Sequence, residues 1–140
     1  MPRTRRLGLA IAAVPLVAAL SGCSVVAAFT PHVEPAIYDT AKELQSSSNA
    51  SLGSMTFVPD DAKVIRIDYD TQTDEAIMTY TSPTLLRPDV CKGAAATPKP
   101  TIQDSWWPVS GVPAEGSACP GKWVAFAIGQ QVYAIRPATK

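Results

Sequence analysis

KVIRIDYDTQTDEAIMTYT, residues 63–81, contains the clearest strand pattern in the chain. In its first part Ile65, Ile67 and Tyr69 alternate with Arg66 and Asp68, a period of two that is typical of a strand with one buried face. The last six residues, AIMTYT, are again rich in residues that favour strands. The polar residues TQTD between the two parts are typical of a turn. The stretch therefore predicts an antiparallel β-hairpin.

A second hairpin is predicted near the end of the sequence. Residues 122–128 place apolar side chains on both faces of an extended chain, which is typical of a central strand. Gly129 to Gln131 supplies a turn, and residues 132–136 return. Together the two hairpins predict an α+β, β-dominated fold. We expect a small antiparallel sheet of about four to six strands with one short N-terminal helix, after a helical signal segment.

The helix is predicted near residues 35–46. Ile37, Ala41 and Leu44 recur at spacings of four and three, and Pro35 suits the first turn of a helix. A serine-rich stretch at 46–51 follows, with the composition of a flexible linker. We therefore expect a tether over 23–54 that contains this helix, and a single folded domain over 55–140.

The first 23 residues form a targeting signal. Three arginines precede an unbroken apolar run from Leu7 to Leu20, a pattern typical of a secretory signal peptide over 1–22. The run ends in Leu20-Ser21-Gly22-Cys23, which resembles the lipobox of bacterial prolipoproteins. That resemblance implies that the chain is cut before Cys23 and that acyl chains on this cysteine hold it on the membrane. An uncleaved membrane helix over 7–29 is the alternative.

The charge balance argues against nucleic acid as a partner. Beyond residue 22 the chain carries nine basic and twelve acidic residues. The basic residues are scattered, so they form no stripe that could follow a phosphate backbone. They also form no polybasic patch of the kind that binds anionic lipid.

Cys91 and Cys119 remain as a pair once Cys23 is assigned to the lipid. An even pair in an oxidising compartment favours a disulfide. The bridge would close the proline-rich stretch between them and contribute roughly 3.5 kcal/mol to stability. A redox or catalytic thiol is the alternative, but the chain has no Cys-x-x-Cys motif.

The sequence offers no catalytic or metal-binding set. The single histidine, His32, falls in the predicted tether without neighbours at metal-ligand spacing. An acidic cluster surrounds the turn of the first hairpin. A solvated turn, a calcium loop and a carboxylate pair for glycoside hydrolysis are its three possible interpretations. We favour the solvated turn and expect no catalytic residue, metal or cofactor. The cluster comprises Asp68, Asp70, Asp74 and Glu75.

Trp106 and Trp107 are the candidate binding surface. Neighbouring residues on an extended chain point in opposite directions, so we expect one indole to pack against the sheet and the other to be exposed. Exposed tryptophan is common in recognition sites. Small cores also use tryptophan freely, and we favour packing alone for both rings over an exposed recognition surface. Trp123, inside a predicted strand, is expected in the core.

These observations predict a lipid-anchored protein on the extracytoplasmic face of the cell membrane. We expect a non-enzymatic binding or accessory module, with an envelope protein or a cell-wall polymer as its partner. A small extracytoplasmic enzyme and a structural envelope component are the alternatives.

Overall fold

The computed structural model of the protein describes residues 32–139. The predicted signal segment 1–22, the predicted lipidation site Cys23 and the first part of the predicted tether lie outside the described residues. Within 32–139 the chain folds into seven strands, one short α-helix and a 3-10 turn. The β-dominated fold class is confirmed, with more strands than the four to six expected.

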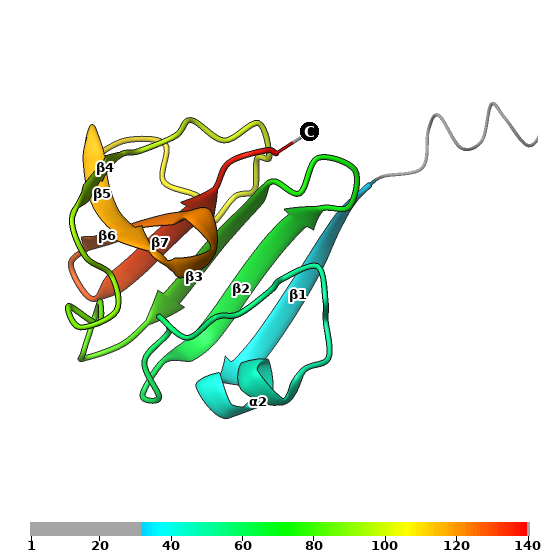
Figure 1. Cartoon of the computed structure of the whole chain (residues 1–140), viewed down its shortest axis with the longest axis horizontal. Helices are drawn as coiled ribbons and strands as arrows, with labels where there is room; N and C mark the ends of the chain where they lie inside the picture. Colours follow the sequence, from blue (N-terminus) through cyan, green and yellow to red (C-terminus); the bar gives the residue numbers. More distant parts are fainter. Residues whose placement is uncertain (1–31, 140) are drawn as a thin grey trace, which may run out of the picture. The chain divides into compact units, whose positions relative to one another are not determined.

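All seven strands belong to one antiparallel sheet with the order β1-β2-β3-β7-β6-β5-β4 (Figure 1). The two predicted hairpins are confirmed as β2–β3 and β6–β7, which lie at the centre of the sheet. The strands are β1 (Val33–Thr40), β2 (Lys63–Asp70), β3 (Ala76–Thr81), β4 (Ala94–Ala96), β5 (Glu115–Cys119), β6 (Trp123–Ile128) and β7 (Gln131–Arg136). The helix is α2 (Ala41–Ser46), and the 3-10 turn is η1 (Pro120–Lys122).

The main core lies on one face of the sheet. The alternation in β2 places Ile65 and Ile67 on this face, where both are fully buried. Trp123 from β6 is 1% exposed in the same core, as expected. The helix α2 and the loop over residues 47–62 cover this face with apolar side chains. Burial of this apolar surface is the dominant favourable contribution to folding.

The helix predicted near 35–46 is wrong in its first half. Val33–Thr40 is a strand that pairs with β2, and only Ala41–Ser46 is helical. Thr40 ends the strand and begins the helix, because its hydroxyl accepts a hydrogen bond from the amide of Glu43. The carboxylate of Glu43 in turn accepts from the amide of Asp39. The sheet domain therefore starts near residue 33, and residues 33–54 belong to it instead of forming a tether.

The second face of the sheet is covered by the proline-rich excursion, residues 97–114. Ile102 and the two neighbouring tryptophans pack there against Ile77, Val124 and Ile135. No strand forms between residues 97 and 114, and β4 and β5 lie on either side of the excursion. The sulfur atoms of Cys91 and Cys119 lie 2.01 Å apart, at disulfide distance. This bridge joins Cys91, shortly before β4, to Cys119 at the end of β5.

Candidate binding site

A pocket of about 620 Å³ lies within the excursion. Its polar contributors include Gln103, Asp104 and the exposed Lys99. Such a volume is in the range of small-molecule and side-chain binding sites in proteins. The apolar part of the wall comprises Pro98, Pro100, Ile102, Trp107, Pro108, Val109, Val112 and Pro113.

Trp107 connects this pocket to the sheet. Its ring meets Phe126 of β6 and Tyr133 of β7 edge to face, with centroid distances of 6.0 and 5.8 Å. Phe126 and Tyr133 are themselves stacked, at 5.6 Å. Edge-to-face and stacked aromatic pairs add stability beyond the area that they bury. Trp107 is therefore held in place by two strands while it lines the pocket.

Trp106 lies on a different part of the same face. It lines a smaller hollow of about 150 Å³ together with Pro35 and Ile37 of β1 and Arg66 and Asp68 of β2. Its ring centroid is 6.3 Å from that of Trp107. Both indoles are partly buried. Neither indole is fully exposed, which agrees with the favoured packing of both rings and not with a division into one packed and one exposed indole.

Thr97 adds a polar feature to the pocket wall. Its hydroxyl oxygen is buried and is without a hydrogen-bond partner among the described residues. A buried polar atom without a partner is costly. Thr97 thus adds an unsatisfied hydroxyl beside a pocket whose other polar contributors are Lys99, Gln103 and Asp104.

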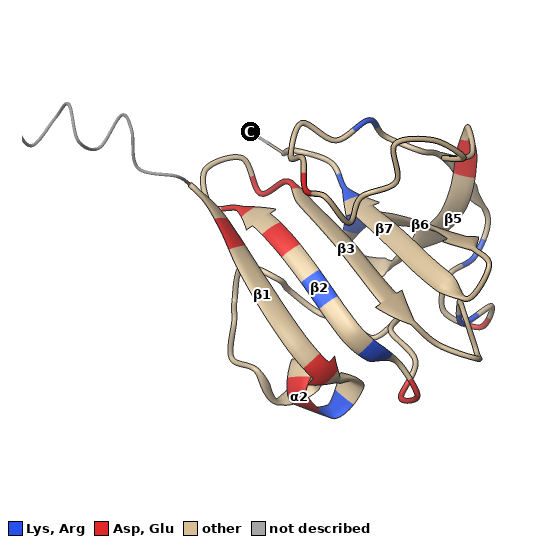
Figure 2. Ribbon diagram, turned by 180° about the vertical axis from the view of Figure 1, so that it is seen from behind, with Lys and Arg blue, Asp and Glu red and all other residues tan. Residues whose placement is uncertain are grey.

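The acidic cluster is not a solvated turn. Asp68 and Asp70 are each 7% exposed, and Glu75 is 3% exposed. Figure 2 shows that the charge along β2 changes from basic at its start to acidic at its end. The alternation in β2 directs Asp68 and Asp70 to the face that the excursion covers. The sequence could not show this covering, so the prediction of solvated carboxylates is wrong for these three residues.

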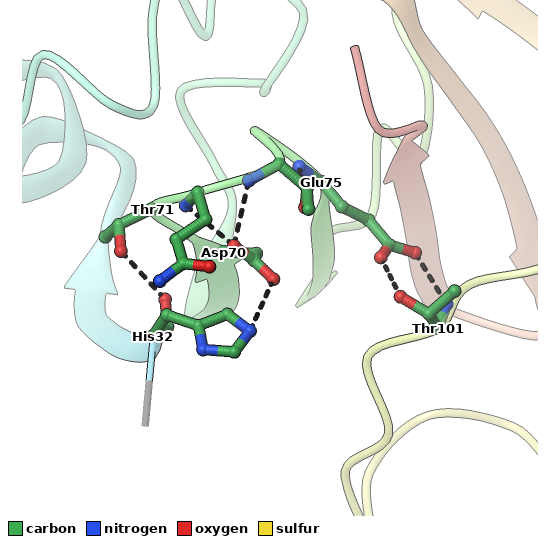
Figure 3. Close-up of polar contacts among 7 residues, drawn as sticks. His32, Asp70, Thr71, Glu75 and Thr101 are labelled. Atoms are coloured by element: carbon green, nitrogen blue, oxygen red, sulfur yellow. Dashed lines mark hydrogen bonds and ion pairs between the residues drawn. The ribbon is translucent and has the colours of Figure 1, made fainter. Parts of the chain in front are cut away.

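Asp70 organises the turn of the first hairpin (Figure 3). Its carboxylate accepts hydrogen bonds from the amides of Gln72 and Thr73 and lies 3.4 Å from the imidazole of His32. Burial alone would raise the pKa of Asp70, but these amides and the nearby histidine outweigh it and keep that pKa below its usual value. The backbone carbonyl of His32 also accepts from the amide and hydroxyl of Thr71. His32 is therefore part of the fold and not of a solvated tether.

Glu75 holds the excursion at one point. Its carboxylate accepts hydrogen bonds from both the amide, at 2.6 Å, and the hydroxyl of Thr101. Figure 3 shows the two side chains pointing toward each other from different segments of the chain. The carboxylates of Asp70 and Glu75 thus each hold a part of the fold together. They do not face each other across a cleft, as a carboxylate pair for glycoside hydrolysis would need.

Asp104 meets the sheet at a second point, where it lines one hollow together with Asp68 and the two carboxyl groups lie within reach of a shared hydrogen bond. Burial, followed by this hydrogen bond and the charge of Asp104, raises the pKa of Asp68 to about 6. Sequence reasoning missed Asp104 because it lies 36 positions from Asp68 and belongs to no motif. An acidic residue two positions before a tryptophan pair was the available signal.

Within residues 32–139, no cluster of three or more potential ligands could hold a metal ion, and no helix is long and apolar enough to cross a membrane. Comparison of the chain with protein-family models, with curated proteins and with solved structures gives no match.

Proposed function

We propose that the protein is a lipid-anchored binding module on the extracytoplasmic face of the cell membrane, and that it takes an apolar group of its partner into the pocket beside Trp107. The lipobox at Leu20 to Cys23 supports the anchor. The pocket supports the binding role, because its walls are apolar yet held firmly to the sheet. A preformed site loses little conformational entropy on binding.

The chemistry of the pocket favours an envelope protein over a cell-wall polymer. Four prolines, two valines and Ile102 make up most of the wall, and these side chains suit an aliphatic or aromatic group. A sugar ring would instead need an open tryptophan face with several polar neighbours. Trp107 is itself partly buried, and its ring already contacts Phe126 and Tyr133.

Site-specific photo-crosslinking in intact cells tests the binding role. Val109 lines the pocket and is fully exposed, so a photoreactive phenylalanine analogue fits there without disturbing the core. We expect one specific adduct from position 109, and its loss when Val112→Glu places a charge in the same pocket. Val64, which is 51% exposed on β2 outside the pocket, is the matched control position. Absence of an adduct at 109, or the same adduct at 64, contradicts the proposal.

The anchor is tested separately. Mass spectrometry of the protein from membranes should find acylated Cys23 as the first residue. Cys23→Ala should leave the precursor uncleaved and unlipidated. A native N-terminus that is unmodified and still begins at Met1 contradicts the anchor but leaves the pocket untouched.

A further inference from the structure

The segment from Thr101 to Trp107 is attached to the sheet at two places, each time through a buried carboxyl group. At its start Thr101 bonds to Glu75. In its middle, Asp104 lines the same hollow as Asp68 of β2, and the two carboxyl groups lie within reach of a shared hydrogen bond. The first attachment joins a carboxylate to an amide and a hydroxyl, which are both donors. The second joins two carboxyl groups, and two carboxylates share a hydrogen bond only while one of them carries a proton.

Asp104 controls the position of both tryptophans of the excursion. Its carboxylate accepts hydrogen bonds from the hydroxyl of Ser105, at 3.0 Å, and the amide of Trp106, at 3.4 Å. Its backbone carbonyl accepts from the amide of Trp107, at 3.1 Å. These bonds form a tight turn, so a movement of Asp104 moves Trp106 and Trp107 with it. Asp104 also lines the proposed ligand pocket and the smaller hollow that contains Asp68.

The proton of the pair resides on Asp68. This residue faces Pro35 of β1 and Ile77 of β3, which give its negative charge no compensation. For Asp104, desolvation would raise the pKa, but the hydrogen bonds from Ser105, Trp106 and Asp68 outweigh it and keep that pKa below its usual value. The opposite directions of the two pKa shifts favour Asp68 as the protonated donor and Asp104 as the ionised acceptor.

The other charged groups on this face either have partners of their own or form no ion pair with Asp68. Asp70, two residues further along β2, is occupied by the turn amides and His32. Glu75, directly before β3, is occupied by Thr101. Arg66 lines the hollow, but within residues 32–139 the ion pairs do not join it to Asp68. A negative charge on Asp68 would thus meet the negative charge of Asp104 without a cation between them.

We propose that the proton shared by Asp68 and Asp104 is a latch that closes the Trp106–Trp107 turn over the sheet and thereby controls binding at the Trp107 pocket. With the proton in place, the turn is fixed and the pocket keeps its walls. Loss of the proton puts two like charges side by side, and the turn separates from β2. This inference rests on the proposed function, since it describes the regulation of the same pocket by the acidity outside the membrane.

Fluorine NMR of protein containing 5-fluorotryptophan tests the latch without any ligand. The three tryptophans give three resonances, which single Trp→Phe variants assign. We expect the resonances of Trp106 and Trp107 to titrate together near pH 6, while that of Trp123, in the core, stays constant and reports intact folding. In Asp68→Asn both titrations should vanish, with the signals fixed near their acidic positions, because the neutral amide can still donate to Asp104.

His32 is the necessary control, because it is the one histidine of the sequence and its imidazole lies 3.4 Å from the carboxylate of Asp70, two residues from Asp68. In His32→Gln the titration of Trp106 and Trp107 should persist. A titration that survives in Asp68→Asn, disappears in His32→Gln, or is absent from the wild type between pH 5 and 7 overturns the latch.

Crosslinking from position 109 separates the latch from the proposed function. We expect several-fold more adduct at pH 5 than at pH 7.5 in the wild type, and equal, high yields at both in Asp68→Asn. A specific adduct with equal yield at both pH values in the wild type overturns the regulation but keeps the binding role. If the resonances of Trp106 and Trp107 titrate but no adduct forms at either pH, the binding role is overturned, and with it the control of binding by the latch.

Discussion

The guanidinium carbon of Arg136 lies 5.3 Å from the ring centroid of Trp123. The same guanidinium donates hydrogen bonds to the backbone carbonyls of Ser51, Leu52 and Asp74. One side chain at the end of β7 thus joins three segments, namely the loop over the core, the turn of the first hairpin and the buried tryptophan.

Arg136→Ala should lower the free energy of unfolding by about 2–4 kcal/mol. The change removes three hydrogen bonds with a charged donor and a cation–π contact. Urea unfolding followed by circular dichroism measures this loss. Arg66→Ala, an exposed arginine on β2, is the matched control and should change stability by less than about 0.5 kcal/mol. Similar losses in the two variants would contradict this role for Arg136.

Removal of the disulfide by the double substitution Cys91→Ala and Cys119→Ala should cost about 3 kcal/mol. The bridge closes a segment whose ends are 28 positions apart, and a loop of this length restricts the unfolded chain considerably. Urea unfolding should show the same loss when the wild type is reduced, and no effect of reductant on the double variant. A loss below about 1 kcal/mol would mean that the bridge contributes little.

Gly116→Ala should disrupt the pairing of β5 with β6. A Cβ at this position would lie 2.7 Å from the carbonyl oxygen of Ala125 and 2.9 Å from a methyl carbon of Val124. Because the nearer atom is backbone, the strands must separate, and we expect a loss of more than about 2 kcal/mol. Gly93→Ala has no such contact and serves as the control, with a cost near 1 kcal/mol from its positive φ. Thermal unfolding compares the two variants.

The stability of the protein should fall as the pH rises through 6. Asp68 binds its proton more tightly in the folded state, where its pKa is about 6, than in the unfolded chain, where it is near 3.9. Its contribution is therefore fully present below about pH 4 and is lost progressively as the pH rises to 6 and beyond. Asp68→Asn should be more stable than the wild type by about 1–3 kcal/mol at pH 8 and equal to it at pH 4. Urea unfolding at the two pH values checks this difference, and a variant that is less stable at pH 8 would contradict it.

The sheet was predictable where the pattern of side chains is local. The alternation of Ile65, Ile67 and Tyr69 identified β2, and the hairpin turn then fixed β3 beside it. Strand β1 was missed because Ile37, Ala41 and Leu44 happen to fit a helical spacing. In fact Ile37 lies in strand β1, whereas Ala41 and Leu44 lie in helix α2. The Thr40-x-x-Glu43 capping pattern marks the change from strand to helix.

The binding site was predictable only in part. Trp106 and Trp107 stood out because paired tryptophans beside a proline are conspicuous in any sequence. The Asp68–Asp104 pair could not be found, because it depends on the path that the excursion takes over the sheet. That path is determined by contacts such as Thr101 with Glu75, which join residues 26 positions apart.

The early start of β1 has a consequence for where the protein can act. From Cys23 to Val33 the chain has ten residue steps, which span at most about 35 Å when fully extended. Val33 pairs with Asp70, so the chain enters the domain at the end that carries the first hairpin turn. If Cys23 carries the proposed lipid, the domain is confined to a thin layer beside the bilayer, where encounters occur by lateral diffusion. A partner would then have to reach this layer, which would favour another membrane-attached molecule over one that is fixed deep in the wall.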